Sequence, residues 1–268
     1  DVYKRQHPKV SIITSVFNGE EYLEETILSV LNQSYDNIEY IIIDGGSTDK
    51  SVDIIKKYED RLAYWISEKD NGMYDGIAKG FSHATGEICA YINSDDFYQP
   101  TAIQTVVNIM TERPEIKWLS GMQTLYNTHS TIVNAFMQIP QSSKQIKKRY
   151  FPIQQEVTFW RSELHNSIDW ERFKSFRLAG DYYMWFCFSS FAEHYVVRAI
   201  LSGFRRHGKQ LSANYEAYQK ELDTFCFKKN VIDVVRQKIM CVVFFKFPRM
   251  FWRNKYMLKW DYVSNKYV

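Results

Sequence analysis

The chain has 268 residues, of which 45% are hydrophobic and 24% charged, so its composition supports a folded core and argues against wholesale disorder. The net charge of +3 hides an asymmetry, because residues 228–268 hold ten Lys or Arg against two Asp or Glu and carry a net +8. The other 227 residues are therefore mildly acidic, and a basic, aromatic tail predicts contact with an anionic surface.

The first 113 residues alternate between apolar strands and amphipathic helices. Strands are predicted at residues 10–16, 38–43, 62–67 and 88–93, and helices at residues 20–31, 52–58, 73–83 and 101–113. Nearly continuous apolar strands are typical of a parallel sheet that is covered on both faces. The pattern predicts an α/β fold with a mainly parallel central sheet flanked by helices.

The second half of the chain is less regular. Its predicted elements are strands at residues 116–122, 131–135 and 194–200, a basic segment at 142–150, and helices at 181–191, 212–227 and 231–247. No internal repeat or clear linker appears. Residues 1–8 are polar and are assigned no role in the fold.

Three polar segments follow predicted strands directly, at residues 17–18, 44–46 and 93–96. In open α/β sheets, ligands bind beyond the carboxyl ends of the strands, so these segments are expected to line one crevice.

The stretch YINSDDFYQP, residues 91–100, places Asp95 and Asp96 side by side after an apolar strand. Two carboxylates at such a position suit Mg²⁺ or Mn²⁺, which also takes oxygens from a substrate diphosphate. The alternative is an aspartate-rich turn that caps the following helix. Their location at the crevice favours the metal site.

The stretch IIIDGGSTD, residues 41–49, puts Asp44 and two glycines between a strand and a helix, as nucleotide-binding turns do. Asp44 is either a ligand contact or only a turn former. The chain has neither a GxGxxG dinucleotide fingerprint after a strand nor a GxxxxGK[ST] phosphate loop. The sequence therefore argues against a dehydrogenase and against a P-loop nucleoside triphosphatase.

Together these motifs, in their order and spacing, resemble family-2 glycosyltransferases of the GT-A fold, the bacterial group that builds exopolysaccharide, capsule or lipopolysaccharide. The resemblance covers residues 9–100 strongly and extends to about 212. It implies a glycosyltransferase domain at 9–212, with a nucleotide-sugar half (9–113) and an acceptor half (114–212). Residues 213–268 would form a basic, aromatic helical extension.

The resemblance also implies site residues. The nucleotide-sugar site would comprise Ser15, Phe17, Asp44, Asp70, Asn71, Asp75, Lys79, Asp95, Arg205 and His207. Asp96 would be the direct metal ligand, with Asp95 on the ribose or the metal. Asn93 stands where the fully acidic motif has its first carboxylate. Asp75 and Lys79 are alternatively an i,i+4 helix pair. The loop of residues 202–212, which includes Arg206 and Lys209, either closes over the donor or is a solvated basic loop.

An inverting transfer needs a carboxylate that removes the proton of the acceptor hydroxyl. Asp181, in RLAGDYYMW, is the candidate, and a plain helix N-cap is the alternative. Gln155 and Glu156 in QQEVTFW are candidates for orienting the acceptor.

The tail alternates basic and bulky residues, which suits a lipid headgroup interface, although a packed helix with a solvated basic face is the alternative. No signal peptide is visible, and the tail's longest apolar run, 239–245, is too short to span a bilayer. Four dispersed cysteines without zinc spacing indicate reduced thiols. We expect a cytoplasmic protein, with peripheral attachment at the inner face of the plasma membrane through the tail, and no nucleic-acid partner.

The predicted function is inverting transfer of a sugar from a nucleoside diphosphate sugar to a glycan or lipid-linked acceptor in cell-surface polysaccharide synthesis, assisted by Mg²⁺ or Mn²⁺. The alternatives are a non-catalytic sugar-nucleotide or glycan-binding module and a sugar nucleotidyltransferase. The donor base and sugar, the acceptor and linkage, and the oligomeric state are not encoded in any recognisable motif.

Overall fold

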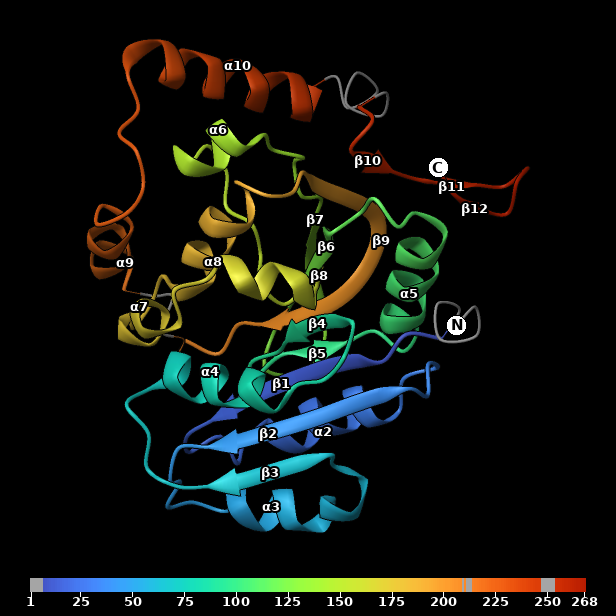
Figure 1. Cartoon of the computed structure of the whole chain (residues 1–268), viewed down its shortest axis with the longest axis vertical. Coiled ribbons are helices and arrows are strands. Elements are labelled where there is room, and N and C mark those ends of the chain that lie inside the picture. The colour runs from blue at the N-terminus through green and yellow to red at the C-terminus, as the bar shows by residue number, and fades with distance from the viewer. Residues whose placement is uncertain (1–6, 209, 211–213, 247–253) are drawn as a thin grey trace.

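The computed structural model describes residues 7–208, 210, 214–246 and 254–268. Within these residues one large sheet runs through the molecule in the order β10-β9-β6-β8-β4-β1-β2-β3 (Figure 1). Two further strands lie off this path, since β5 (Phe97–Tyr98) pairs with β9 and β7 (Ile132–Phe136) pairs with β6.

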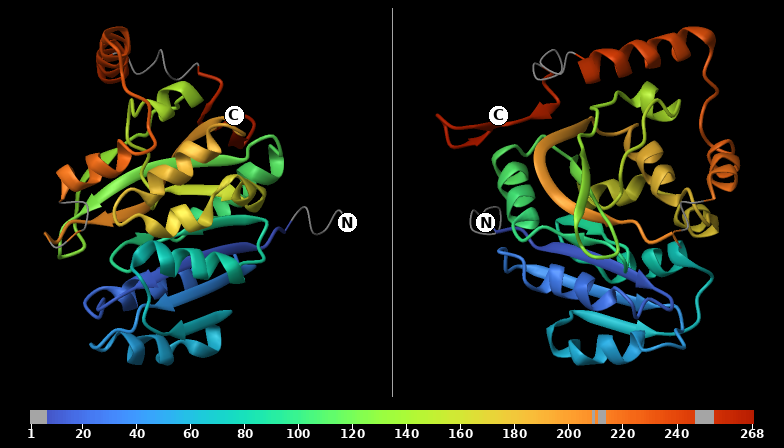
Figure 2. Two further views of the ribbon diagram at one scale, coloured as in Figure 1. Left: turned by 60° about the vertical axis from the view of Figure 1, so that its left-hand side comes forward. Right: turned by 180° about the vertical axis from the view of Figure 1, so that it is seen from behind.

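The first half forms the predicted parallel layer. It contains the strands β1 (Val10–Val16), β2 (Ile38–Asp44), β3 (Tyr64–Ser67) and β4 (Ile88–Tyr91), and the helices α2 (Leu23–Leu31), α3 (Ser51–Lys57), α4 (Met73–His83) and α5 (Ala102–Glu112). A short 3₁₀ helix, η1 (Glu59–Arg61), precedes β3. All four strands are parallel. Helix α4 covers one face of β1 and β2, and α2 lies on the other face (Figures 1 and 2).

In the second half the sheet becomes mixed. Strand β8 (Thr158–Arg161) is antiparallel to both its neighbours, β4 and β6 (Trp118–Tyr126). Strand β9 (His194–Arg205) then runs parallel to β6 and extends five residues beyond the predicted end. The extension is held by β5, which pairs with Ser202 and Gly203. The expected α/β architecture, with a mainly parallel sheet flanked by helices, is confirmed.

The remaining helices of this half are short. They are α6 (Ser143–Lys147), the 3₁₀ helix η2 (Ser162–Ser167), α7 (Trp170–Ser175) and α8 (Gly180–Phe188). The basic segment at 142–150 thus contains α6, and the predicted aromatic helix is α8, which ends three residues early.

The C-terminal part is helical over α9 (Tyr215–Leu222) and α10 (Val231–Lys246). It then adds β10 (Met257–Leu258) to the edge of the sheet beside β9 and ends in the small hairpin β11 (Trp260–Asp261) and β12 (Lys266–Tyr267). Helix α10 lies at the opposite end of the molecule from α3 (Figure 1). Within the described parts of the chain, none of the helices combines the length and apolar character needed to cross a bilayer.

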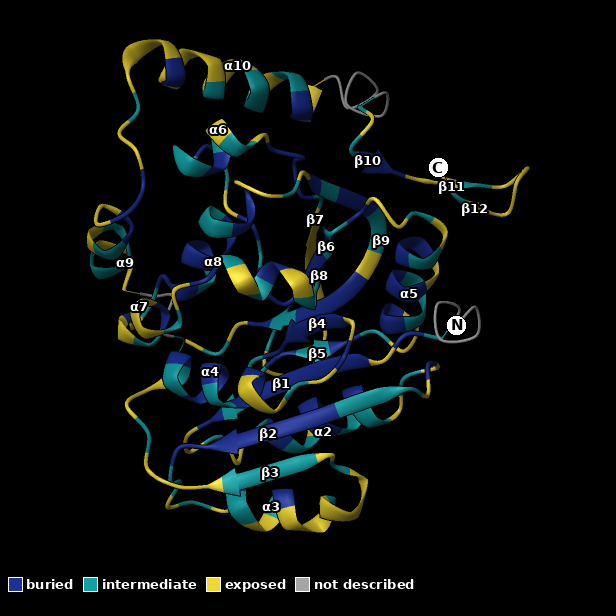
Figure 3. Cartoon of the chain, viewed as in Figure 1, coloured by how far each residue is buried: buried dark blue, intermediate teal, exposed yellow. Residues whose placement is uncertain are grey.

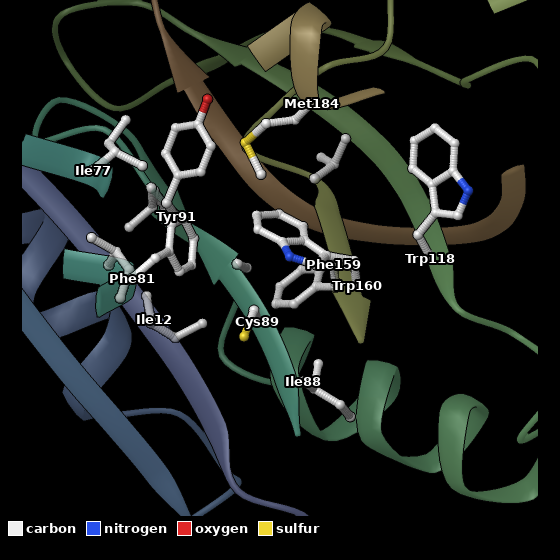
Figure 4. Close-up of a cluster of buried hydrophobic side chains, with 14 of the residues drawn as sticks. Ile12, Ile77, Phe81, Ile88, Cys89, Tyr91, Trp118, Phe159, Trp160 and Met184 are labelled. Atoms are coloured by element: carbon white, nitrogen blue, oxygen red, sulfur yellow. The ribbon is translucent and has the colours of Figure 1, made fainter. Parts of the chain in front are cut away.

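The segments at the junction of the two halves are buried (Figure 3), and an aromatic core joins the halves there (Figure 4). Trp160 of β8 is fully buried and lies 5.6 Å from Phe81 of α4 and 5.6 Å from Trp185 of α8, measured between ring centroids. Trp118 of β6 stacks on Trp185 at 5.6 Å. Removing one such buried ring typically costs about 3–5 kcal/mol, so this core fixes α8 relative to the strands of the first half.

Candidate functional site

The loops after β1 and β2 are hydrogen bonded to each other. Asn18, which has a φ of 52°, donates its backbone N–H to Ser47 Oγ (2.8 Å) and accepts the backbone N–H of Thr48 at its side-chain oxygen (2.8 Å). Gly19 donates its backbone N–H to Ser51 Oγ (2.9 Å). Phe17, at the tip of this arrangement, is 64% exposed and free to contact a flat ring.

Asp44 lies at the end of β2 and is fully buried. Its carboxylate accepts the backbone N–H of Gly46 (3.1 Å), the backbone N–H of Ser47 (2.9 Å) and the hydroxyl of Ser67 (2.6 Å), and it also accepts the hydroxyl of Ser47. Of the two alternatives for Asp44, the structure shows the turn-forming role, in which its carboxylate holds the backbone of the loop after β2.

Ser15 and Asp70 lie together beside two glycines. A Cβ atom on Gly76 would come within 2.4 Å of Ser15 Oγ and 3.1 Å of Asp70 Oδ2, and a Cβ on Gly45 within 2.8 Å of the same Asp70 atom. Burial raises the pKa of Asp70 above its usual range. The ends of β1 and β2 and the start of α4 thus form one compact corner of the crevice.

The segment that leads into α4 is organised by its own carboxylates. Asp75 accepts both the backbone N–H and the side-chain amide of Asn71, each at 3.0 Å. Asp70 accepts the backbone N–H of Gly72 (2.9 Å), whose φ of 121° favours glycine. Lys79 pairs with Glu68 on the preceding segment, so the alternative i,i+4 pair with Asp75 is not the contact it makes.

Asp95 and Asp96 face different surroundings. Asp95 is partly exposed, and its Oδ2 lies 2.8 Å from His207 Nε2. Asp96 is 1% exposed, its Oδ1 accepts the backbone N–H of Arg205 (3.0 Å), and its Oδ2 is buried without a hydrogen-bond partner. Burial, followed by the charges of Asp95 and Glu156, raises the pKa of Asp96 well above its usual range.

Arg205 stabilises the turn that carries Asp95 and Asp96 from the interior of the protein. Its guanidinium is 1% exposed and donates to the backbone oxygen of Asp95 (3.2 Å) and to Ser130 Oγ (2.9 Å), and it pairs with Glu25. It also lies 4.6 Å from the ring of Tyr22 and 5.4 Å from that of Phe97. These contacts hold Arg205, which was predicted to belong to the nucleotide-sugar site, in the protein interior. Arg206 is exposed, and Lys209 lies outside the described residues.

Asp181 lies in the first turn of α8 and is partly buried. Its Oδ1 accepts the backbone N–H of Tyr182 (2.6 Å). Burial raises the pKa of Asp181 to about 7, while the Tyr182 N–H and the Tyr74 hydroxyl act in the opposite direction. A carboxylate whose pKa lies near neutral pH is suited to accepting a proton.

Gln155 and Glu156 lie beneath the site and not on its surface. Gln155 is 6% exposed and donates to the backbone oxygen of Tyr91, and Glu156 is 2% exposed and accepts from Gln123. Burial, together with the charges of Asp181 and Asp95, raises the pKa of Glu156 to about 7. Glu156 is therefore within electrostatic reach of both residues and forms part of the floor beneath them.

The structure thus brings the ends of β1, β2 and β4 together at one edge of the sheet, with His207 beside Asp95. Asp181 is linked to this group through its electrostatic interaction with Glu156. Sequence reasoning missed Glu25 and Tyr22, because the contact of Arg205 with Glu25 spans 180 residues, that with Tyr22 is similarly distant in the chain, and neither leaves a local pattern. Within the described ranges, no three His, Cys, Asp or Glu side chains form a metal cage.

Comparison with known proteins gives consistent matches. The family model for glycosyl transferase family 2 matches residues 11–176. An uncharacterized glycosyltransferase of Rickettsia typhi is 27% identical over 209 residues, which are 76% of this chain and 65% of that protein. The chain spans between 43% and 65% of the length of the first five curated relatives it matches.

Two solved structures share the fold at low sequence identity. The complex of Staphylococcus aureus TarS (residues 1–349) with UDP-GlcNAc has a TM-score of 0.62 at 15% identity, covering 90% of this chain and 74% of that one. The mannosyltransferase PcManGT of Pyrobaculum calidifontis, in complex with GDP-Man and Mn²⁺, has a TM-score of 0.55 at 16% identity, covering 77% of this chain and 59% of that one. The family match spans more than half of the chain and confirms the resemblance found in its motifs: the chain belongs to glycosyl transferase family 2.

Proposed function

We propose that the chain transfers a sugar, with inversion, from a nucleoside diphosphate sugar to a glycan or lipid-linked acceptor in cell-surface polysaccharide synthesis. The observation that carries this proposal is the pairing of Asp95, within the family-2 match, with His207, together with Asp181, whose pKa is raised to about 7. The buried Glu156 interacts with the charges of both Asp95 and Asp181. The complexes of the two structural neighbours with UDP-GlcNAc and GDP-Man support a nucleotide-sugar donor.

The donor would lie across the carboxyl ends of β1, β2 and β4. Phe17, exposed at the tip of the first loop, would stack on the base, and the corner formed by Ser15 and Asp70 would receive the nucleoside. Asp44 would shape this corner through the turn it closes. The diphosphate and the sugar would lie along the start of α4, beside Asn71, Asp75 and Lys79.

Asp95 and His207 fit a divalent cation better than Asp96 does. A carboxylate oxygen and an imidazole nitrogen 2.8 Å apart could turn toward one ion, with the remaining ligands supplied by the donor diphosphate. Asp96 is enclosed, and one of its oxygens is already bonded to the Arg205 backbone. When bound, Mg²⁺ or Mn²⁺ would neutralise the departing diphosphate. The direct protein ligand of the metal is thus proposed to be Asp95. Asp96 would stabilise the turn through its hydrogen bond with the Arg205 backbone.

The proposed reaction is a single in-line displacement. Asp181 takes the proton of the acceptor hydroxyl while the oxygen of that hydroxyl forms a bond to the anomeric carbon. The bond between the anomeric carbon and the diphosphate oxygen breaks at the same time, and the nucleoside diphosphate leaves. Gln155 and Glu156 would stabilise the floor beneath the acceptor, since both are buried.

A panel of nucleoside diphosphate sugars tests this function. We expect one donor or a few to raise the melting temperature in the presence of Mn²⁺, because a ligand that binds only the folded state stabilises it. The same donors should release nucleoside diphosphate when acceptors are added. Release of pyrophosphate would indicate a nucleotidyltransferase, and binding without any release would indicate a non-catalytic module, so either result would overturn the proposal.

Helix α10 supports the proposal that the tail meets an anionic membrane. Its inner face is anchored to the body, where Asp233 pairs with Lys148 and accepts the hydroxyl of Tyr150 (2.8 Å). Its outer face is apolar, with Val231, Val235, Ile239 and Val242 exposed by 79%, 49%, 56% and 52% (Figure 3). Surface helices ordinarily place the apolar face inward.

The charges around this outer face are complementary to anionic lipid. Residues 228–246 hold five basic side chains against the single carboxylate of Asp233, which Lys148 already neutralises. An apolar stripe bordered by Lys and Arg suits insertion at the headgroup boundary. The part of the basic tail at 247–253 lies outside the described residues.

Vesicle sedimentation tests the outer face of α10. We expect the full chain to sediment at low salt with vesicles rich in phosphatidylglycerol and not with phosphatidylcholine vesicles. The double variant Val235→Gln/Ile239→Gln should weaken binding about tenfold, because it removes two exposed apolar side chains from the interface. Val133→Gln, an equally exposed valine on β7, is the matched control. Equal binding by the double variant and the control would refute the interfacial role.

A further inference from the structure

The loop that presents Asp181 is tied to helix α9. The carboxylate of Glu221 accepts three consecutive backbone N–H groups, those of Arg177 (2.9 Å), Leu178 (2.9 Å) and Ala179 (2.8 Å). These residues come directly before α8, whose first turn holds Asp181. In Figure 1, α9 lies beside α7 and α8 at one side of the molecule.

The same loop is held from the opposite side by α4. The hydroxyl of Tyr74 donates to the backbone oxygen of Leu178 (2.9 Å). The Tyr74 ring also occupies the space beside Gly180, where an added Cβ would come within 2.7 Å of the ring carbons. The loop at 177–180 is therefore enclosed between a phenol from the nucleotide-sugar half and a carboxylate from the C-terminal extension.

We propose that Glu221 is a positioning residue for the transfer reaction, which holds the loop at 177–179 so that the carboxylate of Asp181 faces the acceptor. The proposal rests on the proposed function, because it requires Asp181 to be the base. It is independent of the family match, which ends at residue 176. Since a misplacement of about 1 Å in a catalytic group can cost 100-fold in rate, three bonds at this point are a strong constraint on turnover.

Glu221 also acts on Asp181 through its charge. The titratable groups that interact electrostatically with Asp181 come from α4, β4, α8, α9 and the segment before β8. They are Tyr74, Tyr91, Glu156, Tyr182, Tyr218 and Glu221. After burial, the negative charge of Glu221 is a further cause that raises the pKa of Asp181. Removing that charge should lower this pKa, so that Asp181 becomes deprotonated at a lower pH.

The test uses Glu221→Gln in the full chain. Glutamine keeps the size of the side chain but replaces one acceptor oxygen by an NH₂ group, so at least one of the three backbone N–H groups loses its partner. We expect kcat for nucleoside diphosphate release to fall about 10- to 100-fold with an unchanged donor KM. The acidic limb of the pH–kcat profile should move to lower pH. Glu221→Asp, which keeps the charge and both oxygens, should restore the position of the limb.

Glu216→Gln is the matched control, because Glu216 is exposed on the same helix and pairs only with Lys220 in the described structure. It should leave kcat and the pH profile unchanged. Glu221→Gln could instead lower the melting temperature while its kcat and the acidic limb of its pH–kcat profile stay as in the wild type. That result would show a purely structural role for Glu221 and overturn the proposal.

The variant Asp181→Asn distinguishes the role of Asp181 as the base from the role of Glu221 as a positioning residue. If this variant keeps its kcat, the base assignment fails and the role of Glu221 fails with it. If Asp181→Asn is inactive while Glu221→Gln behaves as wild type, only the positioning role is refuted. In the Asp181→Asn background, Glu221→Gln should cause no further loss of kcat, since the group it positions is no longer a base.

Discussion

Asp181→Asn is expected to lower kcat by about 100- to 10,000-fold, the range that positioned general bases contribute. Asparagine preserves the shape of the side chain and the oxygen that accepts the Tyr182 N–H, so α8 should remain intact. It has no basic oxygen that can hold the proton of the acceptor. The donor KM should change little, because the proposed role of Asp181 concerns the proton of the acceptor and not the binding of the donor.

The pH dependence provides a second readout of the same residue. With the pKa of Asp181 raised to about 7, the wild-type kcat should increase as the pH rises through about 7 and level off above it, because only the deprotonated form accepts a proton. In Asp181→Asn this limb should disappear. Asp169→Asn, at the exposed N-cap of α7, is the control and should retain both the rate and the limb. Retention of the limb in Asp181→Asn would assign it to another group.

Asp95→Ala is expected to reduce kcat by about 1,000-fold and to abolish the response of the enzyme to added Mn²⁺. Stabilisation of a departing diphosphate by a cation is worth several kcal/mol, and each 1.36 kcal/mol corresponds to a factor of ten. EDTA should have the same effect on the wild type, and Mn²⁺ should reverse it. Metal titrations of diphosphate release measure both.

Asp96→Asn distinguishes the two carboxylates of the motif. Its amide oxygen can still accept the Arg205 N–H, so the turn should persist and the Mn²⁺ requirement should stay near that of the wild type. If Asp96→Asn loses the Mn²⁺ response while Asp95→Ala keeps it, the direct ligand is Asp96, as the sequence alone had indicated.

The parallel layer was predictable because each of its strands is a short apolar run between turn residues, and each helix is amphipathic. Helix α4 begins and ends at the predicted residues. The mixed half was harder, since β8 has four residues and takes its place only through pairing with β4 and β6, which lie far away in the sequence. The end of β9 was missed because Ser202 and Gly203 resemble a turn, whereas β5 and β6 hold them extended.

The site residues could likewise be predicted where local sequence patterns place them, and not where contacts between distant elements do. The meeting of the loops at residues 17–18, 44–46 and 93–96 follows from strand order alone, so it could be predicted. The burial of Arg205 and Glu156 could not be predicted, because charged side chains are almost never fully buried unless they are paired. Both are retained inside by partners from distant elements, Glu25 for Arg205 and Gln123 for Glu156. Glu221 lies on a short amphipathic helix with no sequence signal for the three backbone groups it binds.

The pairing of β10 with β9 has a consequence for how the chain can be divided. Val196 of β9 donates its backbone N–H to Tyr256 (2.8 Å), and the pair β9–β10 continues through Val197. A chain that stops at residue 212 would leave this part of β9 as an open edge, with unpaired backbone donors and acceptors beside an apolar strand. Such edges pair with other chains, so the shortened protein would be prone to self-association. The C-terminal segment thus protects the solubility of the domain it follows.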